Sequence, residues 1–219
     1  MKNSNHPLFP SLSKEGKTGD VDRINYFYSI KYFCGISILL LTCSTAPEEC
    51  GIGYIDINGK CYNQGDVDVL QDFIDNSRGD DSTTTITMTL DTDGSGTIEP
   101  FELQPQRWNE NGRLTMLWLY DDTLSGVIPE SIGNLTQLDT LNLAFNQLSG
   151  EIPQSIGSLI NLNYLYLYRN QLSGTIPDSI CNIIPNIPHF WIEYNYFCPP
   201  YPDCIPEAEI NPQNTSQCP

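Results

Sequence analysis

Residues 91–102, which read DTDGSGTIEPFE, concentrate oxygen-bearing side chains in one short acidic segment. A hard divalent cation such as Ca²⁺ prefers carboxylate, hydroxyl and carbonyl oxygens and takes about six to eight of them. Asp91, Asp93 and Glu102 supply carboxylates, and Gly96 allows a sharp turn between them. The segment therefore predicts either a calcium loop or an acidic surface turn that binds nothing tightly.

The same twelve residues resemble the calcium-binding loop of EF-hand proteins. The resemblance implies that Ile98 packs inward and that Ca²⁺ binds weakly, with a dissociation constant of about 10⁻⁴–10⁻³ M. The implied ligands are the side chains of Asp91, Asp93 and Ser95, the Thr97 carbonyl, Glu99 through water, and both oxygens of Glu102. The flanks depart from the EF-hand pattern, because residues 83–90 alternate like a strand and Pro105 limits the helix that should follow. We expect the loop to rigidify its surroundings rather than to act as a switch.

Few side chains are arranged for catalysis. The two histidines are His6 and His189, and no serine or cysteine nucleophile motif accompanies either. The 219 residues carry 10 Lys+Arg against 27 Asp+Glu, a formal net charge of −17. Carboxylates are therefore too plentiful for one pair to stand out as an acid and a base. The same charge argues against nucleic acid as a partner, since phosphate binding needs clustered cations. We expect a protein that is not an enzyme.

An internal repeat with a period of 24 covers residues 114–197. Full units begin at Leu114, Leu138 and Leu162, and a partial unit begins at Ile187. In each unit, paired apolar residues alternate with polar or aromatic ones, which is the pattern of a short strand with one buried side. An Asn follows each strand, with Asp122 in its place in the first unit, and can bond backbone groups left unpaired at the turn. Because one unit cannot bury its apolar side alone, the units must stack and the ends must be capped.

The repeated sequence LxxLxLxxNxLSGxIPxxIGxL resembles the plant-type leucine-rich repeat of extracellular receptor domains. The resemblance implies an α/β solenoid: a short right-handed coil with one parallel strand per repeat, a helical N-terminal cap and a disulfide-rich C-terminal cap. The segment WNENGRL from Trp108 resembles the end of that N-terminal cap, although the cap's usual Cys pair is absent before Gly112. Residues 66–77 have apolar residues at helical spacing, with Asp66 or Asp68 able to cap, and predict the cap helix.

The resemblance places the side chains that flank the paired leucines on the concave face of the solenoid, where we expect a ligand. This face is rich in aromatic rings, which supply stacking area and a polar tip at low entropy cost. The predicted ligand-binding residues are Trp118, Tyr120, Asn142, Tyr164, Tyr166, Tyr168, Trp191 and Glu193. The expected function is a monomeric surface recognition module for a protein or carbohydrate ligand. Alternatively, the rings stabilise the sheet by cross-strand contact, and the chain is a calcium-stabilised structural or adhesion protein with the repeat as a spacer.

Residues 33–42 form a continuous apolar run. Its length suits a signal-peptide core of about 7–15 residues but not a membrane span, which needs about 20. We therefore expect export to the extracellular space or the cell surface. Residues 40–43, Leu-Leu-Thr-Cys, resemble a bacterial lipobox, which implies lipidation of Cys43 and anchoring in an outer membrane. The alternative is an ordinary cleaved signal.

Six cysteines remain after Cys34 and Cys43, and they predict disulfides near both ends of the repeat. Cys50 and Cys61 form the natural N-terminal pair. Three connectivities are open to the other four, which are Cys181, Cys198, Cys204 and Cys218. A zinc site is the rival interpretation, but the sequence has no CxxC. The expected organisation is an export signal over 1–43, an acidic cap over 44–113, repeats over 114–197 and a Cys/Pro-rich C-terminal cap over 198–219.

Overall fold

The structure is a computed structural model that describes residues 50–78, 98–103, 105–210 and 212–218. The predicted export signal, including Cys43, and residues 91–97 of the predicted calcium loop lie outside the described residues. All elements named below belong to the unit Ser44–Pro219. In the described part, no helix is long and apolar enough to cross a membrane.

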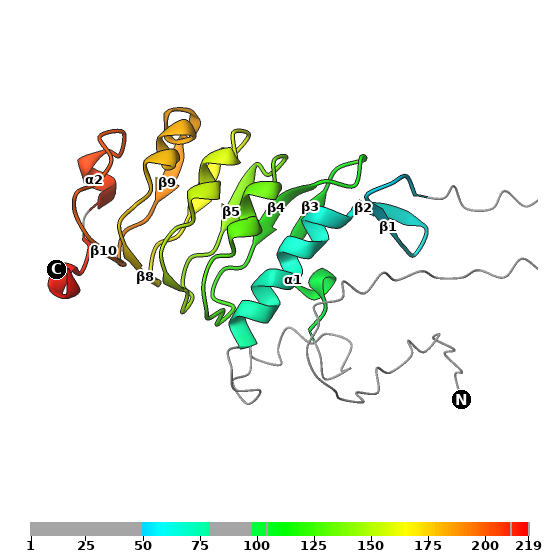
Figure 1. Cartoon of the computed structure of the whole chain (residues 1–219), viewed down its shortest axis with the longest axis horizontal. Helices are drawn as coiled ribbons and strands as arrows, with labels where there is room; N and C mark the ends of the chain where they lie inside the picture. The colour runs from blue at the N-terminus through cyan, green and yellow to red at the C-terminus, as the bar shows by residue number, and fades with distance from the viewer. Residues whose placement is uncertain (1–49, 79–97, 104, 211, 219) are drawn as a thin grey trace, which may run out of the picture. The chain divides into compact units, whose positions relative to one another are not determined.

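Successive turns of the repeat stack side by side and contribute one short strand each (Figure 1). The strands described are β4 (Leu114–Trp118), β5 (Thr140–Asn142), β7 (Tyr164–Tyr166) and β9 (His189–Trp191), which run parallel, and β3 (Gln106–Trp108), which pairs antiparallel with β4. We call these strands the five-stranded sheet. A second parallel sheet contains β6 (Ser149–Gly150), β8 (Gln171–Gly174) and β10 (Tyr196–Phe197). The arrangement agrees with the predicted solenoid of stacked repeats, whereas the handedness of its coil stays a prediction.

The core of the solenoid consists of leucines and isoleucines from the strands and from the returning segments. Leu141 and Leu143 are fully buried, as the alternation of their unit predicts. Each turn returns through 3-10 helices, which are Glu130–Asn134, Gln154–Ser158, Asp178–Asn182 and Ile184–Asn186. The first three of these helices each contribute a fully buried isoleucine to the same core. Neighbouring turns therefore share one continuous apolar interior, which is what stabilises a solenoid.

Close packing between consecutive 3-10 helices limits the residue type at one position of each unit. A Cβ on Gly133 would lie 2.7 Å from the Ser155 carbonyl oxygen, and one on Gly157 would lie 2.4 Å from a backbone oxygen of the next turn. Neither glycine has a positive φ, so the lack of space alone selects glycine here. The same position of the third unit is Cys181, which forms a disulfide with Cys204 instead.

An asparagine after each strand joins the backbones of two neighbouring turns. Asn146 Nδ2 donates to the carbonyl oxygens of Leu119 at 2.6 Å and Leu143 at 3.0 Å. Its Oδ1 accepts from the Leu124 N–H at 2.9 Å and from one further N–H. The same pattern continues at Asn170 and Asn195. The predicted role of the repeated Asn is confirmed, and we call these three residues the asparagine ladder.

Asp122 occupies the ladder position of the first unit but cannot donate as an amide does. Burial raises the pKa of the Asp122 carboxyl to about 6, and the charge of Asp121 adds to the rise. The carboxyl of an unfolded chain would titrate at the ordinary value of 3.8. Ionisation of Asp122 therefore penalises the folded state. The penalty is absent below pH 3.8 and is complete once the pH has risen through 6.

We expect Asp122→Asn to raise the free energy of unfolding by about 1–2 kcal/mol at pH 8, a value reduced for partial solvation of the group. At pH 3.5 the ionisation penalty is gone, so the gain over the native chain should be smaller. Urea unfolding at both pH values measures the difference, with the exposed Asp203→Asn as the matched control. Equal gains in the free energy of unfolding at the two pH values would contradict a raised pKa of the Asp122 carboxyl.

Helix α1 (Gln64–Arg78) follows the hairpin of β1 (Tyr54–Ile57) and β2 (Lys60–Asn63) and covers the range 66–77 in which the sequence predicts a helix. The predicted capping by Asp66 or Asp68 is wrong. Asn63 Oδ1 accepts the Asp66 N–H at 3.1 Å and so caps the helix.

The Asp66 carboxylate pairs with an arginine that precedes the first repeat strand. Arg113 Nε donates to Asp66 Oδ2 at 2.8 Å, and its Nη2 donates to Oδ1 at 2.9 Å. The Leu114 N–H donates to the same carboxylate at 2.8 Å. The Asp66 side chain is 0% exposed. This buried ion pair joins α1 to the first turn of the repeats.

Disulfides lie on both sides of the repeats in the described residues. The predicted pair Cys50–Cys61 is confirmed, and the C-terminal pairs are Cys181–Cys204 and Cys198–Cys218. The C-terminal segment contains α2 (Glu207–Ile210) and the 3-10 helix Thr215–Gln217. It also bonds the last turn, since the Tyr194 N–H donates to the Pro212 carbonyl oxygen at 2.8 Å. Because disulfides persist in oxidising compartments, these pairs support an extracellular or cell-surface location.

Candidate functional site

The strand register brings the predicted ligand-binding residues into rows across the five-stranded sheet. In one row, Trp118 pairs with Asn142, Asn142 with Tyr166, and Tyr166 with Trp191. In the neighbouring row, Tyr164 pairs with His189, and their rings stack with centroids 4.7 Å apart. Each repeat therefore contributes one or two side chains to a common surface.

Six rings form a continuous series on this surface, and we call them the aromatic face. In order of contact they are Trp118, Tyr166, Trp191, Tyr168, Phe145 and Tyr120. Centroids of successive rings lie 4.9 to 6.3 Å apart, which is the range of favourable aromatic contact. Trp118, Tyr120 and Trp191 are nevertheless 38, 40 and 42% exposed. The rings thus support one another and still offer large apolar area to solvent.

Asn142 does not belong to the accessible part of this surface, and its assignment as a ligand contact is corrected. The residue is 2% exposed, and its Oδ1 accepts the Ala144 N–H at 3.0 Å. The physical reason is side-chain size. The small residues of the middle unit lie between bulky rings on both sides, and Trp118 and Tyr166 approach each other across Asn142 at 6.3 Å. Asn142 therefore supports the aromatic face from beneath.

Four residues with left-handed backbone lie in or beside the aromatic face, and one of them, Phe145, belongs to it. Asp121, Phe145, Arg169 and Tyr194 each precede the ladder position and have φ between 55° and 61°. This backbone turn lets the Arg169 guanidinium lie over two rings, 5.0 Å from the Phe145 centroid and 4.7 Å from that of Tyr194. The sequence prediction of contact residues left Phe145, Arg169 and Tyr194 out, and the signal that identifies them is their place just before the repeated Asn.

Burial changes the acidity of the central tyrosines. It raises the pKa of both the Tyr166 and the Tyr168 hydroxyl, and the charge of Glu193 adds to the rise at Tyr168. Both hydroxyls therefore stay protonated at neutral pH and can donate. The Glu193 Oε2 atom is buried and has no hydrogen-bond partner among the described residues. This end of the aromatic face thus carries donor and acceptor capacity beside the rings.

Only the end of the predicted calcium loop lies within the described residues. Asp91, Asp93, Ser95 and Thr97 lie outside them. Glu99 precedes the 3-10 helix Pro100–Glu102, and its N–H donates to the Glu102 carboxylate at 3.0 Å. The side chains described elsewhere contain no cluster of His, Cys, Asp and Glu that could hold a metal ion.

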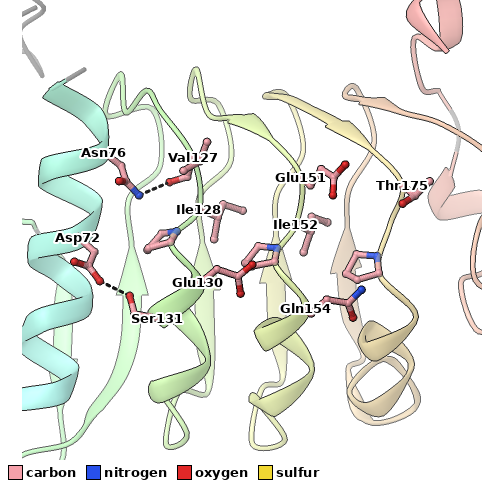
Figure 2. Close-up of a pocket in the computed structure, with 13 residues that line it drawn as sticks. Asp72, Asn76, Val127, Ile128, Glu130, Ser131, Glu151, Ile152, Gln154 and Thr175 are labelled. Atoms are coloured by element: carbon pink, nitrogen blue, oxygen red, sulfur yellow. Dashed lines mark hydrogen bonds between the residues drawn. The ribbon is translucent and has the colours of Figure 1, made fainter. Parts of the chain in front are cut away.

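A groove of about 560 Å³ lies away from the aromatic face, between α1 and the segments around three repeated prolines. Figure 2 shows its two lining hydrogen bonds, from Asn76 to the Val127 carbonyl and from Ser131 to the Asp72 carboxylate. Since α1 residues form both bonds, the groove marks the junction of the helix with the first turn. Its walls contain none of the predicted ligand-binding residues.

Residues 137–159 and 161–183 match the Leucine Rich Repeat family model. These two segments are leucine-rich repeats. They contain β5 and β7, so the leucine-rich repeats carry the central columns of the aromatic face. No curated protein matches the sequence.

Several solved plant receptor ectodomains are similar to part of this chain. The ectodomain of the Arabidopsis thaliana receptor kinase GASSHO1/SCHENGEN3, in complex with Casparian strip integrity factor 2, is 43% identical over 38% of this chain, with a TM-score of 0.37. The Arabidopsis receptor kinase HAESA, in complex with the peptide hormone IDA and the co-receptor SERK1, is 35% identical over 40%, with a TM-score of 0.37. The chain spans only 10% and 15% of the lengths of these two structures. The ectodomain of SOBIR1 from Arabidopsis thaliana is 23% identical over 62% of this chain and 70% of its own length, with a TM-score of 0.41.

Proposed function

We propose that the protein is an exported surface recognition module that binds a protein or a glycan on the aromatic face. One observation carries the proposal: three of the largest side chains in the chain remain about two-fifths exposed on one face of the five-stranded sheet. Contiguous exposed apolar surface on a soluble protein marks interaction sites. The module acts by binding and not by catalysis.

Sheet stabilisation alone accounts for only part of this surface. Ring-to-ring contact explains why Tyr166 and Tyr168 lie between their neighbours. It does not explain the open sides of Trp118 and Trp191, which lie at 38 and 42% exposure. Smaller β-formers would pair across the strands without this exposed area. A ligand that covers the exposed sides of Trp118 and Trp191 would explain why these large side chains are there.

The test compares the full chain with the triple variant Trp118→Ala/Tyr166→Ala/Trp191→Ala. Both are screened against a phage-displayed peptide library and a panel of purified polysaccharides. We expect at least one class of binder for the native chain and loss of that binding in the triple variant. Ile160→Ala, which removes a side chain 64% exposed outside this face, is the matched control. Thermal unfolding shows whether the triple variant is folded, and unchanged binding by a folded triple variant would refute the proposal in favour of a structural or adhesion role.

We also propose weak Ca²⁺ binding by residues 91–102, supported by the sequence motif. At 10 mM Ca²⁺ and a dissociation constant of about 10⁻³ M, linkage stabilises the folded chain by about 1.4 kcal/mol, a rise of about 3–5 °C in Tm. Differential scanning calorimetry with and without Ca²⁺ measures this rise. Asp91→Ala/Asp93→Ala is the control, because Glu102 also bonds the Glu99 N–H and its loss would perturb the helix by itself. The same rise in both proteins would exclude the loop as the site.

Attachment to an outer membrane through a lipidated Cys43 is the last part of the proposal. It is supported by the lipobox-like residues 40–43. Expression in a Gram-negative host with a radiolabelled fatty acid should label the native chain but not Cys43→Ser. Export of an unlabelled native chain would instead indicate an ordinary signal peptide.

A further inference from the structure

We infer that the ligand is a neutral glycan, with one pyranose ring stacked on Trp191 and its hydroxyls bonded by Arg169 and Glu193. This inference rests on the function proposed above and names the ligand class of the same face. Three neighbouring features carry it: a fixed guanidinium, a carboxylate oxygen without a partner, and an open indole ring. We call this group the C-terminal subsite.

Arg169 is held in position by rings rather than by an acid. Its guanidinium lies over Phe145 and Tyr194, and its side chain has no hydrogen bond or ion pair with the described residues. A guanidinium offers five N–H donors in a planar fork, and these point outward from its edge. Two aromatic contacts restrict the side chain before any ligand arrives, so less conformational entropy is lost on binding. Arg169 is therefore a preorganised donor.

Glu193 lies next to this donor and supplies the acceptor. The Arg169 N–H donates to the Glu193 carbonyl oxygen at 3.0 Å, which places the two residues side by side on adjacent turns. The buried Glu193 Oε2 lacks a hydrogen-bond partner in the described part of the chain, a costly state for a carboxylate oxygen. Vicinal hydroxyls of a sugar can accept from Arg169 and, once rotation of the Glu193 side chain exposes its carboxylate, donate to Glu193.

Trp191 provides the surface on which a sugar ring would stack. It lies two residues before Glu193, which follows the end of β9, so the two residues are close together in the same turn. Trp191 is 42% exposed: the Tyr166 ring lies tilted against it at 4.9 Å and the Tyr168 ring makes a T-shaped contact at 5.8 Å, so part of the indole stays accessible. The negative face of an aromatic ring attracts the polarised C–H bonds of a pyranose.

The closed centre of the aromatic face and the negative charge around it favour a neutral sugar over a peptide or an acidic polymer. A peptide usually anchors a side chain in a pocket, whereas Ala144 and Asn142 at the centre of this face are 0 and 2% exposed and offer no accessible side chain there. An acidic polymer would meet Asp121 and Glu193 in a chain with a formal net charge of −17. A neutral sugar ring needs no pocket for a side chain and is not repelled by these carboxylates.

The test uses native affinity electrophoresis of the full chain in gels that contain laminarin, xylan, mannan, alginate or polygalacturonate. We expect at least one of the three neutral polymers to retard the protein and the two acidic polymers to leave it unretarded. Trp191→Ala should weaken that binding at least about tenfold, which corresponds to 1.4 kcal/mol. Glu193→Gln and Arg169→Lys should weaken it about three- to tenfold, since each keeps the approximate size but loses an acceptor charge or a planar fork. Ile160→Ala is the matched control and should bind as the native chain does.

Three results would overturn the inference: no retardation by any neutral polymer, retardation by acidic polymers alone, or unchanged retardation of a folded Trp191→Ala variant. The peptide screen separates this failure from that of the proposed function. If phage-displayed peptides need the aromatic face while no neutral polymer binds, the recognition module stands and the glycan is wrong. If neither class binds through that face, both are wrong.

Discussion

Replacing Arg113 by Met should lower the free energy of unfolding by about 3–5 kcal/mol, because the change leaves the Asp66 charge buried without its partner. Asp66 is 0% exposed and accepts two bonds from this one guanidinium. Arg113 Nη2 also donates to the Asn134 carbonyl oxygen at 3.0 Å, so the substitution removes a bond to the following 3-10 helix as well. Urea unfolding followed by tryptophan fluorescence gives the change.

Arg107→Met is the matched control, since Arg107 is exposed on β3 and should change the stability by no more than about 0.5 kcal/mol. The double variant Asp66→Asn/Arg113→Met should recover part of the loss, because no uncompensated charge remains in the interior. A single-variant loss no larger than that of the control would show that water reaches Asp66 and that the pair does not hold α1 to the repeats.

Asn146→Ala should also lower the free energy of unfolding strongly, by about 3–4 kcal/mol. Asn146 is 8% exposed and bonds three carbonyl oxygens and two N–H groups of its own turn and the preceding one. Alanine has no polar atom to replace these bonds, so buried backbone groups lose their partners between the first and second units. Denaturant unfolding measures the loss, and hydrogen exchange should show faster exchange at the N–H of Leu124.

Asn163→Ala is the control for this substitution. Asn163 is exposed and bonds Asp139 and the Asn161 carbonyl oxygen, so its removal should cost about 0.5 kcal/mol or less. Unaltered exchange at Leu124 in a destabilised Asn146→Ala variant would mean that the loss arises elsewhere.

The stacked strands and the role of the repeated Asn could be predicted from the sequence because both are local and periodic. A period of 24 with alternating leucines allows little besides a solenoid, and each Asn acts within one turn of its own position. The pairing of Asp66 with Arg113 was not predictable in this way. The two residues are 47 positions apart, and only the packing of α1 on the first turn brings them together. For the same reason the pairs Cys181–Cys204 and Cys198–Cys218 could not be chosen among three connectivities.

The sequence predicts which residues of the candidate site share one side of the sheet, but not how deeply each side chain is buried. Alternation places Asn142 and Trp118 on one side of the sheet, and it is correct for both. It contains no information about the size of neighbours, which is why the burial of Asn142 beneath two rings was missed. The left-handed position of Arg169 and its contact with Phe145 likewise depend on a backbone turn that strand periodicity does not describe.

The close contact at Gly133 and Gly157, and its replacement by Cys181, determine where this solenoid can lengthen by unit duplication. A copied first or second unit brings its own glycine to the new junction and fits against the next turn. A copied third unit would press a cysteine side chain into the backbone of its neighbour and would leave two cysteines competing for Cys204. The repeat region can therefore lengthen by duplication of the first or second unit but not of the third. The reason is that the third unit has Cys181 where the other two have glycine.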